Sequence, residues 1–504
     1  MKVTFKMMVA VLVMLLALPM LTYAAGGSDS AAGQFDHKLS IMVNFNMPEP
    51  PRDNSDMLLY LRNTLKADID FNWYPTPAYG NALGVRLSAN DLPDAVVVRG
   101  SAKPANIVSA VRDCMFWELD PYLSNPAWPG LAKLSPDRYN NIRIDGKVYG
   151  LPIERELVQA GVLYRQDWLD NLGIAEPRNM DDIWNIIQAF SQRNPDGSGR
   201  EITGLSMKGS NLSGKVTDVS VYYGGQMEWY WDPAARIVRH QTEDPAFYRS
   251  MDFHRDAYAR RFFVQDLVEL TDEYLPIDQG RAGLVFFSDF NDVVDTQLSV
   301  SAVFPEARIN FTQRLIGPNG NIVNRSHIGF NGGFYFPRTA SRNQARFEEV
   351  LRFFDLLGSD DAILTLRRGI RDKHYTVQNG VLAATADQIR NFRERDFPDA
   401  QLITPFGVTR VIPEGFSDPL TQAIFDSMIN YDGDRFLSIS DVYISETAVR
   451  LGGTLSQILS DARMRYVLGD INRAQFDSEV ARWRAAGGDQ VQRDYTTVFT
   501  ANPW

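Results

Sequence analysis

The stretch GKVYGLPIERELVQAGVLYRQDWLDNLG, residues 146–173, changes its pattern twice. It begins with the apolar alternation of a strand, is interrupted by Pro152 and by the charges of Glu154, Arg155 and Glu156, and continues as a helix. Proline cannot donate to a central ladder, so we expect the strand to end at Pro152. The charged break must meet polar partners, because an unpaired charge is costly to bury.

The rest of the chain alternates between strand and helix patterns. Residues 38–45, 67–75 and 92–100 are short apolar runs bounded by turn residues, which is typical of strands. Residues 180–190 carry apolar side chains at helical spacing, and Asn179 is placed to cap that helix. Strands separated by helices predict an α/β fold with mainly parallel sheets.

The length and charge of the chain limit its architecture and its partners. The roughly 470 residues that follow the N-terminal leader exceed the usual size of one domain, so two or more lobes are expected. There are 51 Lys and Arg against 62 Asp and Glu, a net charge of −11, which argues against nucleic acid as a partner. Cys114 is the only cysteine, so no intramolecular disulfide can form.

The first 24 residues have the pattern of a secretory signal peptide. Lys2 and Lys6 precede an apolar run over residues 7–18, and residues 22–24 suit a cleavage site. Residues 25–36 are small and polar and are expected to form a flexible tether. No later segment is apolar enough to span a membrane, so we expect a periplasmic or extracellular protein.

Common enzyme signatures are absent from the sequence. The histidines are scattered without an HExxH pair, and there is no GxSxG motif, P-loop or GxGxxG after a strand. A glycosidase needs two carboxylates across a cleft, for which Glu154 and Glu156 are candidates, although hydrogen-bonded or solvated acids are the commoner case. An exported carbohydrate-active enzyme, either a glycosidase or a lyase, therefore stays an alternative.

Residues 194–205 share the first half of a calcium-binding loop. Asn194, Asp196 and Ser198 supply oxygens at the first three ligand positions, and Gly199 follows where such loops turn. The ninth and twelfth positions are apolar, so the far half of the cage is missing. A plain helix-stopping turn is favoured over a calcium site, and no other cofactor is expected.

Eight motifs follow one another along the mature chain: DLPDAVVV (91–98), ELDPYL (118–123), GKVYGLP (146–152), LYRQDWLDNLGIAEPRNMDDI (163–183), GRAGLVF (280–286), GGFYFP (332–337), GIRDKHYTVQNG (369–380) and YVLGDINRAQFDSEVARWRAAGGDQV (466–491). In this order they resemble the sugar-type extracellular solute-binding proteins of ABC importers, in the long branch that includes alginate-oligosaccharide binders. Many members of that family carry a cysteine for lipid attachment after the signal peptide. LTYAAGGSDS (21–30) has none, so lipid anchoring is not expected.

The resemblance implies the type II periplasmic-binding-protein fold, with two α/β lobes and a ligand cleft between them. Each lobe would be a mainly parallel sheet flanked by helices. The first lobe would comprise residues 37–152 and 331–375, and the second residues 153–330 and 376–504. GKVYGLP would be the first crossing between the lobes, and GGFYFP the return.

Candidate ligand residues are chosen by their place at the carboxyl ends of strands and beside the crossings. They are Asn44, Asn46, Arg99, Glu154, Arg155, Glu156, Trp229, Trp231, Phe287, Asp289 and Tyr335. Carboxylates and arginines can pair with vicinal hydroxyls, arginine alone favours an acidic sugar, and aromatic rings suit the apolar faces of sugars.

The expected function is the substrate-binding component of an ABC transporter. Such a protein would capture an oligosaccharide and deliver it to a membrane permease, and it is expected to be a monomer. A peptide or amino-acid binder on the same fold is a further alternative, because a fold does not fix its ligand.

Overall fold

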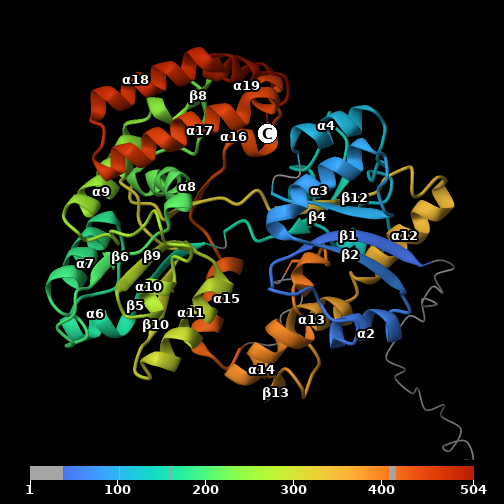
Figure 1. Cartoon of the computed structure of the whole chain (residues 1–504), viewed down its shortest axis with the longest axis horizontal. Helices are drawn as coiled ribbons and strands as arrows, with labels where there is room; N and C mark the ends of the chain where they lie inside the picture. Colours follow the sequence, from blue (N-terminus) through green and yellow to red (C-terminus); the bar gives the residue numbers. More distant parts are fainter. Residues whose placement is uncertain (1–37, 101–102, 159, 408–415, 504) are drawn as a thin grey trace, which may run out of the picture.

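Two hydrophobic cores, each built around one β-sheet, organise the chain in the computed structural model (Figure 1). The structure describes residues 38–503, except 101–102, 159 and 408–415. The first core takes its buried side chains from residues 39–153, 328–366 and 397–406, and the second from residues 160–323, 375–382 and 416–499. Segments far apart in the sequence therefore build each lobe.

The first lobe holds a five-stranded sheet in the order β2-β1-β3-β12-β4. Its strands are β1 (Leu39–Phe45), β2 (Ile69–Pro75), β3 (Ala95–Val98), β4 (Gly150–Glu154) and β12 (Phe330–Tyr335). β1 pairs in parallel with β2 and β3, whereas β12 is antiparallel to β3 and β4. The helices that bury side chains against it are α2 (Asp56–Asn63), α3 (Thr76–Ser88), α4 (Ala105–Arg112), α12 (Gln344–Leu356) and α13 (Asp360–Arg368).

The second lobe holds a four-stranded sheet in the order β10-β5-β9-β6. Its strands are β5 (Gly161–Arg165), β6 (Thr203–Leu205), β9 (Ala282–Ser288) and β10 (Ile309–Thr312). β6 is parallel to β9, and β5 is antiparallel to β9 and β10. The helices of its core include α7 (Met180–Gln192), α8 (Gly209–Val219), α9 (Pro245–Ala259), α11 (Phe290–Val303), α15 (Pro419–Ile429), α17 (Glu446–Leu468), α18 (Arg473–Trp483) and α19 (Asp489–Ala501).

One strand in each sheet runs against the others, and each follows a crossing between the lobes. β5 comes directly after the chain leaves the first lobe, and β12 comes directly after its return. The remaining strands of each sheet share one direction, as the prediction of mainly parallel sheets requires. The pairings beside β5 and β12 are antiparallel, a detail that the alternation of strand and helix patterns did not show.

The expectation that a strand ends at Pro152 is wrong. β4 continues through Pro152 to Glu154. It lies at the edge of its sheet and pairs with β12 alone, and an edge strand tolerates a residue that has no N–H to donate. The chain then enters β5 and α6 (Gln166–Leu172), so the stretch does lead from one sheet to the other.

Residues 397–406 differ from the predicted division, which placed residues 376–504 in the second lobe. Phe397, Leu402 and Phe406 are buried in the first core. The segment is also tied there by the Glu154 N–H, which donates to the Pro405 carbonyl at 2.8 Å. The five buried apolar residues of this segment stand at irregular spacing and carry no strand or helix period, so the sequence pattern could not assign them.

Contacts at two places join the lobes outside the crossing segments. Lys103 Nζ in the first lobe donates to the Val442 carbonyl in α16 (Ile439–Val442) at 2.6 Å, and Arg112 of α4 pairs with Glu446 of α17 at 2.8 Å. Elsewhere, Arg393 pairs with Asp295 of α11. The two sheets are thus held facing each other by more than the crossings alone (Figure 1).

Candidate ligand site at the junction of the lobes

The carboxyl end of β1 presents two asparagines that other parts of the first lobe hold in place. Asn44 is 1% exposed, its Nδ2 donates to Thr76 Oγ1 at 2.7 Å, and its Oδ1 has no hydrogen-bond partner. Asn46 is exposed and is fixed by Asp399, which accepts from its N–H at 2.8 Å and from its Nδ2 at 3.1 Å. A buried amide oxygen without a donor is costly, so a ligand hydroxyl would be a favourable partner for Asn44.

Arginines from three elements converge beside these asparagines. Arg99 follows β3, and its Nη1 is buried without a hydrogen-bond partner. Burial, with Arg155 as a further cause, lowers the pKa of Arg99 to about 10. Burial likewise lowers the pKa of Arg367 in α13 to about 9, again with Arg155 contributing. Cations that depress one another's pKa stand close together, and an anionic ligand would relieve that repulsion.

Arg155 lies at the centre of this group, just after β4. Its backbone N–H donates to the Gly329 carbonyl at 2.8 Å and its Nη1 to the Glu154 carbonyl at 2.9 Å. Burial lowers the pKa of Arg155, while Asp289 of the second lobe and Glu156 raise it. The guanidinium therefore stands where the first crossing meets both lobes.

The two glutamates of the same stretch are turned toward the first lobe. Glu154 is 1% exposed, and its Oε1 and Oε2 accept from the backbone N–H groups of Ser135 at 3.0 Å and Gly407 at 3.2 Å. Glu156 accepts from Arg138 Nη2 at 3.0 Å. These contacts give the glutamates a structural role, and they correct the expectation that both face a ligand.

The second lobe contributes the end of β9 and the start of α11. Phe287 has a φ of 54°, a backbone region that is costly for an aromatic residue. Its ring stacks on Tyr222 with centroids 5.6 Å apart and planes within 8°, and the Arg325 guanidinium lies 5.4 Å from its centroid. The strained backbone thus holds one ring, which is 9% exposed, against an aromatic ring and a cation.

Asp289 and Asp292 also lie where β9 ends and α11 begins. The Asp289 N–H donates to Asp292 Oδ2 at 2.9 Å. Burial and the neighbouring Asp289 raise the pKa of Asp292 to about 6. Because Asp289 also supports the charge of Arg155, the acidic end of α11 faces the arginine cluster across the junction.

Three predicted aromatic ligand residues lie elsewhere. Tyr335 is fully buried in the first core against Phe116, with centroids 5.2 Å apart. Trp229 is buried against His240 and Trp483 under the C-terminal helices, and Trp231 packs on a ring of α19. Tertiary packing, on helices late in the chain for the two tryptophans, explains this error because single-residue patterns cannot reveal it. Asp399, Arg325 and Arg367 were missed because isolated polar residues carry no period.

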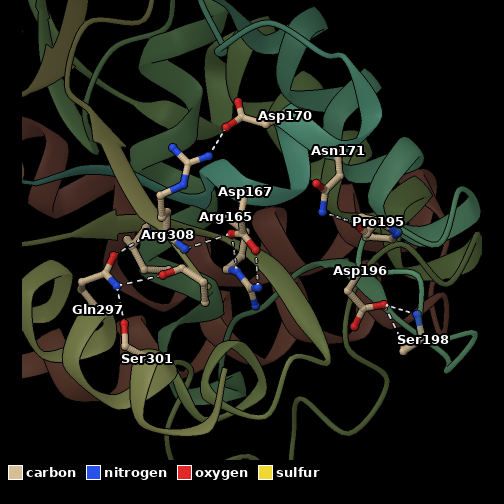
Figure 2. A network of polar contacts seen from close by, with 12 residues as sticks. Arg165, Asp167, Asp170, Asn171, Pro195, Asp196, Ser198, Gln297, Ser301 and Arg308 are labelled. Carbon is tan, nitrogen blue, oxygen red and sulfur yellow. Dashed lines mark hydrogen bonds and ion pairs between the residues drawn. The ribbon is translucent and has the colours of Figure 1, made fainter. Parts of the chain in front are cut away.

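The calcium-like loop is closed by its own side chains. Asp196 Oδ1 accepts from the Ser198 N–H at 3.0 Å, and Asp196 Oδ2 accepts from Arg200 Nη2 at 2.5 Å. The Gly199 N–H donates to Asn194 Oδ1 at 2.8 Å, and Asn171 fastens the loop by donating to the Pro195 carbonyl (Figure 2). Arg200 therefore supplies the positive charge that a calcium ion would bring.

We expect calcium to leave the stability of this protein unchanged. Because Arg200 already neutralises the single carboxylate among the candidate ligands, about 1 mM Ca²⁺ should shift the melting temperature by no more than about 1 °C relative to EDTA. Differential scanning fluorimetry in both buffers, with magnesium as the control ion, measures this. A rise of several degrees that is specific to calcium would contradict the expectation.

Another group with metal-ligand spacing, found among the described residues, is already satisfied. Asp56, His374 and Asp396 bring their ligand atoms within 4.8 Å of one another. Lys373 Nζ, however, lies 2.6 Å from Asp56 and 2.9 Å from Asp396. The Ile370 N–H donates to His374 Nδ1, which leaves the ring proton on Nε2 to bond Asp396. The group is therefore an internal network of hydrogen bonds and ion pairs in the first lobe.

The comparisons with known proteins agree with this geometry. No model of a protein family matches the sequence. The polygalacturonan/rhamnogalacturonan-binding protein YtcQ of Bacillus subtilis (strain 168) is 26% identical over 506 residues, which cover 98% of this chain and 99% of that protein. The structure of the alginate-binding protein AlgQ2 without calcium ion aligns over 93% of this chain and 99% of that one, with a TM-score of 0.67 and 15% identity.

A further structure aligns over nearly the same length. It is the S. pneumoniae ABC-transporter substrate binding protein FusA in complex with kestose, with a TM-score of 0.63 and 13% identity over 92% of this chain and all of that one. The chain is thus similar over nearly its whole length to carbohydrate-binding proteins, among them the substrate-binding protein of an ABC transporter. The predicted two-lobed α/β fold is thereby confirmed.

The described part of this chain contains no helix that is both long and apolar enough to cross a bilayer. The predicted signal peptide (1–24) and tether (25–36) lie outside the described residues. Ligand groups that touch both lobes would favour one relative position of the lobes over others.

Proposed function

We propose that this protein is the substrate-binding component of an ABC importer and that it captures an acidic oligosaccharide. The observation that carries the proposal is the cluster of Arg99, Arg155 and Arg367 at the junction. The chain as a whole is acidic, with a net charge of −11, so a local group of cations at the cleft is not a general property of its surface. Arginine pairs with carboxylates through two parallel hydrogen bonds, which suits the carboxylate of a uronate.

The remaining groups at the junction suit the rest of a sugar. The Asn44 Oδ1 can accept from a hydroxyl. Asp289 stands across from Arg155 and can accept from hydroxyls of a ring bound between the lobes. The relative named for polygalacturonan and rhamnogalacturonan, and the structure named for alginate, both bind acidic polysaccharides by their names, which supports an acidic ligand.

Binding without chemistry fits the site better than hydrolysis. A glycosidase needs one carboxylic acid and one carboxylate poised across the cleft. Glu154 is occupied by backbone donors of the first lobe and Glu156 by Arg138. The pair is therefore committed to the fold, and we propose a non-catalytic role in which an exported protein passes its ligand to a membrane permease.

Native mass spectrometry and calorimetry test this proposal. We expect trigalacturonate to bind with micromolar or tighter affinity, to raise the melting temperature and to be recovered unchanged. Galactotriose of equal length, which lacks only the carboxylates, should bind at least about tenfold more weakly, because charged hydrogen bonds contribute about 1.5–3 kcal/mol each. Equal affinity for both trimers would contradict the proposal that the ligand is acidic. Cleavage of either trimer would contradict the non-catalytic transport role.

A further inference from the structure

A hollow opens on the second lobe, beside a small two-stranded sheet. It has a volume of about 630 Å³ and lies between the turn after α8, the start of α9 and the strands β11 (Val323–Arg325) and β15 (Asp434–Phe436). Its size is within the range of small-molecule sites, about 300–1,000 Å³. We infer that this cavity is a distal subsite that receives the far end of a long acidic oligosaccharide, an inference that rests on the proposed function.

The side chains that line the cavity have the chemistry of an acidic sugar site. Arg249 and Arg435 provide two guanidinium groups from separate elements, and Tyr223 and Phe436 provide two rings. The single carboxylate in the lining, Asp434, already accepts from Asn321 Nδ2 at 2.9 Å. The balance of charge in the cavity therefore favours an anion, and the rings favour the apolar face of a pyranose.

One strand pair contributes residues both to the cavity and to the candidate site. β11 and β15 run in parallel, with Val323 opposite Asp434 and Arg325 opposite Phe436. Phe436 lines the cavity, while Arg325, its neighbour across the strands, lies over the Phe287 ring in the candidate site. Neighbouring strands are about 4.8 Å apart, so a residue that lines the cavity lies on a strand adjacent to one that contacts the candidate site.

The cavity also borders the first lobe. Hydrogen bonding from Ser135 lowers the pKa of Asp137 in α5 (Pro136–Tyr139), and Arg435 contributes to the same shift. Arg435 therefore lies near Asp137 of the first lobe. This arrangement assigns to the protein a preference for ligands longer than the central site alone can hold.

The double variant R249Q/R435Q tests the subsite. Both side chains are exposed, so the fold should be retained, and glutamine keeps their polarity while removing two charges. Calorimetry with oligogalacturonates from the dimer to the hexamer should show wild-type affinity rising with length. In the variant, we expect the affinity for the longest chains to fall by about 10- to 100-fold, with the dimer unchanged, because only long chains reach the cavity.

The control is R261Q/R482Q, which removes two exposed charges of the second lobe outside the cavity lining. It should leave the affinity for every length within about twofold, since exposed charges away from the ligand are screened. Unchanged binding by R249Q/R435Q, or an equal loss of affinity at every length, would contradict the distal subsite but leave the proposed acidic ligand in place. If the wild type bound no oligogalacturonate at all, the acidic ligand itself would be excluded and the subsite with it.

Discussion

Replacing Arg155 by alanine should weaken the binding of trigalacturonate by about 10- to 100-fold, because a charge-assisted hydrogen bond to a carboxylate contributes about 1.5–3 kcal/mol. The contacts that hold the backbone in place are made by the Arg155 N–H to Gly329, which the substitution keeps. Removing one of several clustered cations should also relieve repulsion on Arg99 and Arg367. The melting temperature of the free protein should therefore stay near that of the wild type.

The conservative variant Arg155→Lys separates charge from geometry. Lysine keeps the charge but loses the fork that pairs with both oxygens of a carboxylate, so its affinity should lie between those of the wild type and Arg155→Ala. Arg261→Ala, an exposed arginine of the second lobe, is the matched control. Calorimetry measures all three affinities. Wild-type affinity in Arg155→Ala would place the ligand away from the arginine cluster.

The alternation of strand and helix patterns was sufficient to predict the class of the fold. Buried runs such as β3 and the cap at Asn179, whose Oδ1 accepts from the Asp182 N–H at 2.9 Å, are local features with strong signals. The reversed strands β5 and β12 were not predicted, because direction within a sheet depends on where a distant crossing delivers the chain. The same limit explains why residues 397–406 were placed in the wrong lobe.

The candidate site was only partly predictable for a related reason. Asn44, Arg99, Arg155, Phe287 and Asp289 lie at strand ends, which parallel sheets direct toward one edge, so their places could be inferred from topology. Trp229 and Tyr335 also lie at the ends of strands, yet residues from remote parts of the chain cover them, Trp483 of α18 on Trp229 and Phe116 on Tyr335. Whether a ring near a strand end faces a ligand or a helix is decided by tertiary packing, which short-range patterns do not encode.

Replacing Glu154 by alanine should lower the free energy of unfolding by about 3–5 kcal/mol, the usual cost of removing one partner from a buried ionic group. The side chain is fully buried, and its loss leaves the N–H groups of Ser135 and Gly407 without their acceptor. The positive charge of Arg138, 3.6 Å away, also loses one of its neutralising carboxylates.

Urea unfolding followed by tryptophan fluorescence measures the loss, which should concentrate in the transition of the first lobe, because Ser135, Arg138 and Gly407 adjoin that core. Glu156→Ala is the matched control, since this glutamate is nearer the surface, and its loss should cost less than half as much. If Glu154 instead served a ligand or a reaction, Glu154→Ala would keep its stability and lose binding or turnover. Because both oxygens of Glu154 have partners in the fold, we expect the opposite result, a loss of stability. The function of Glu154 would then be to fix the crossing from which Arg155 reaches the ligand.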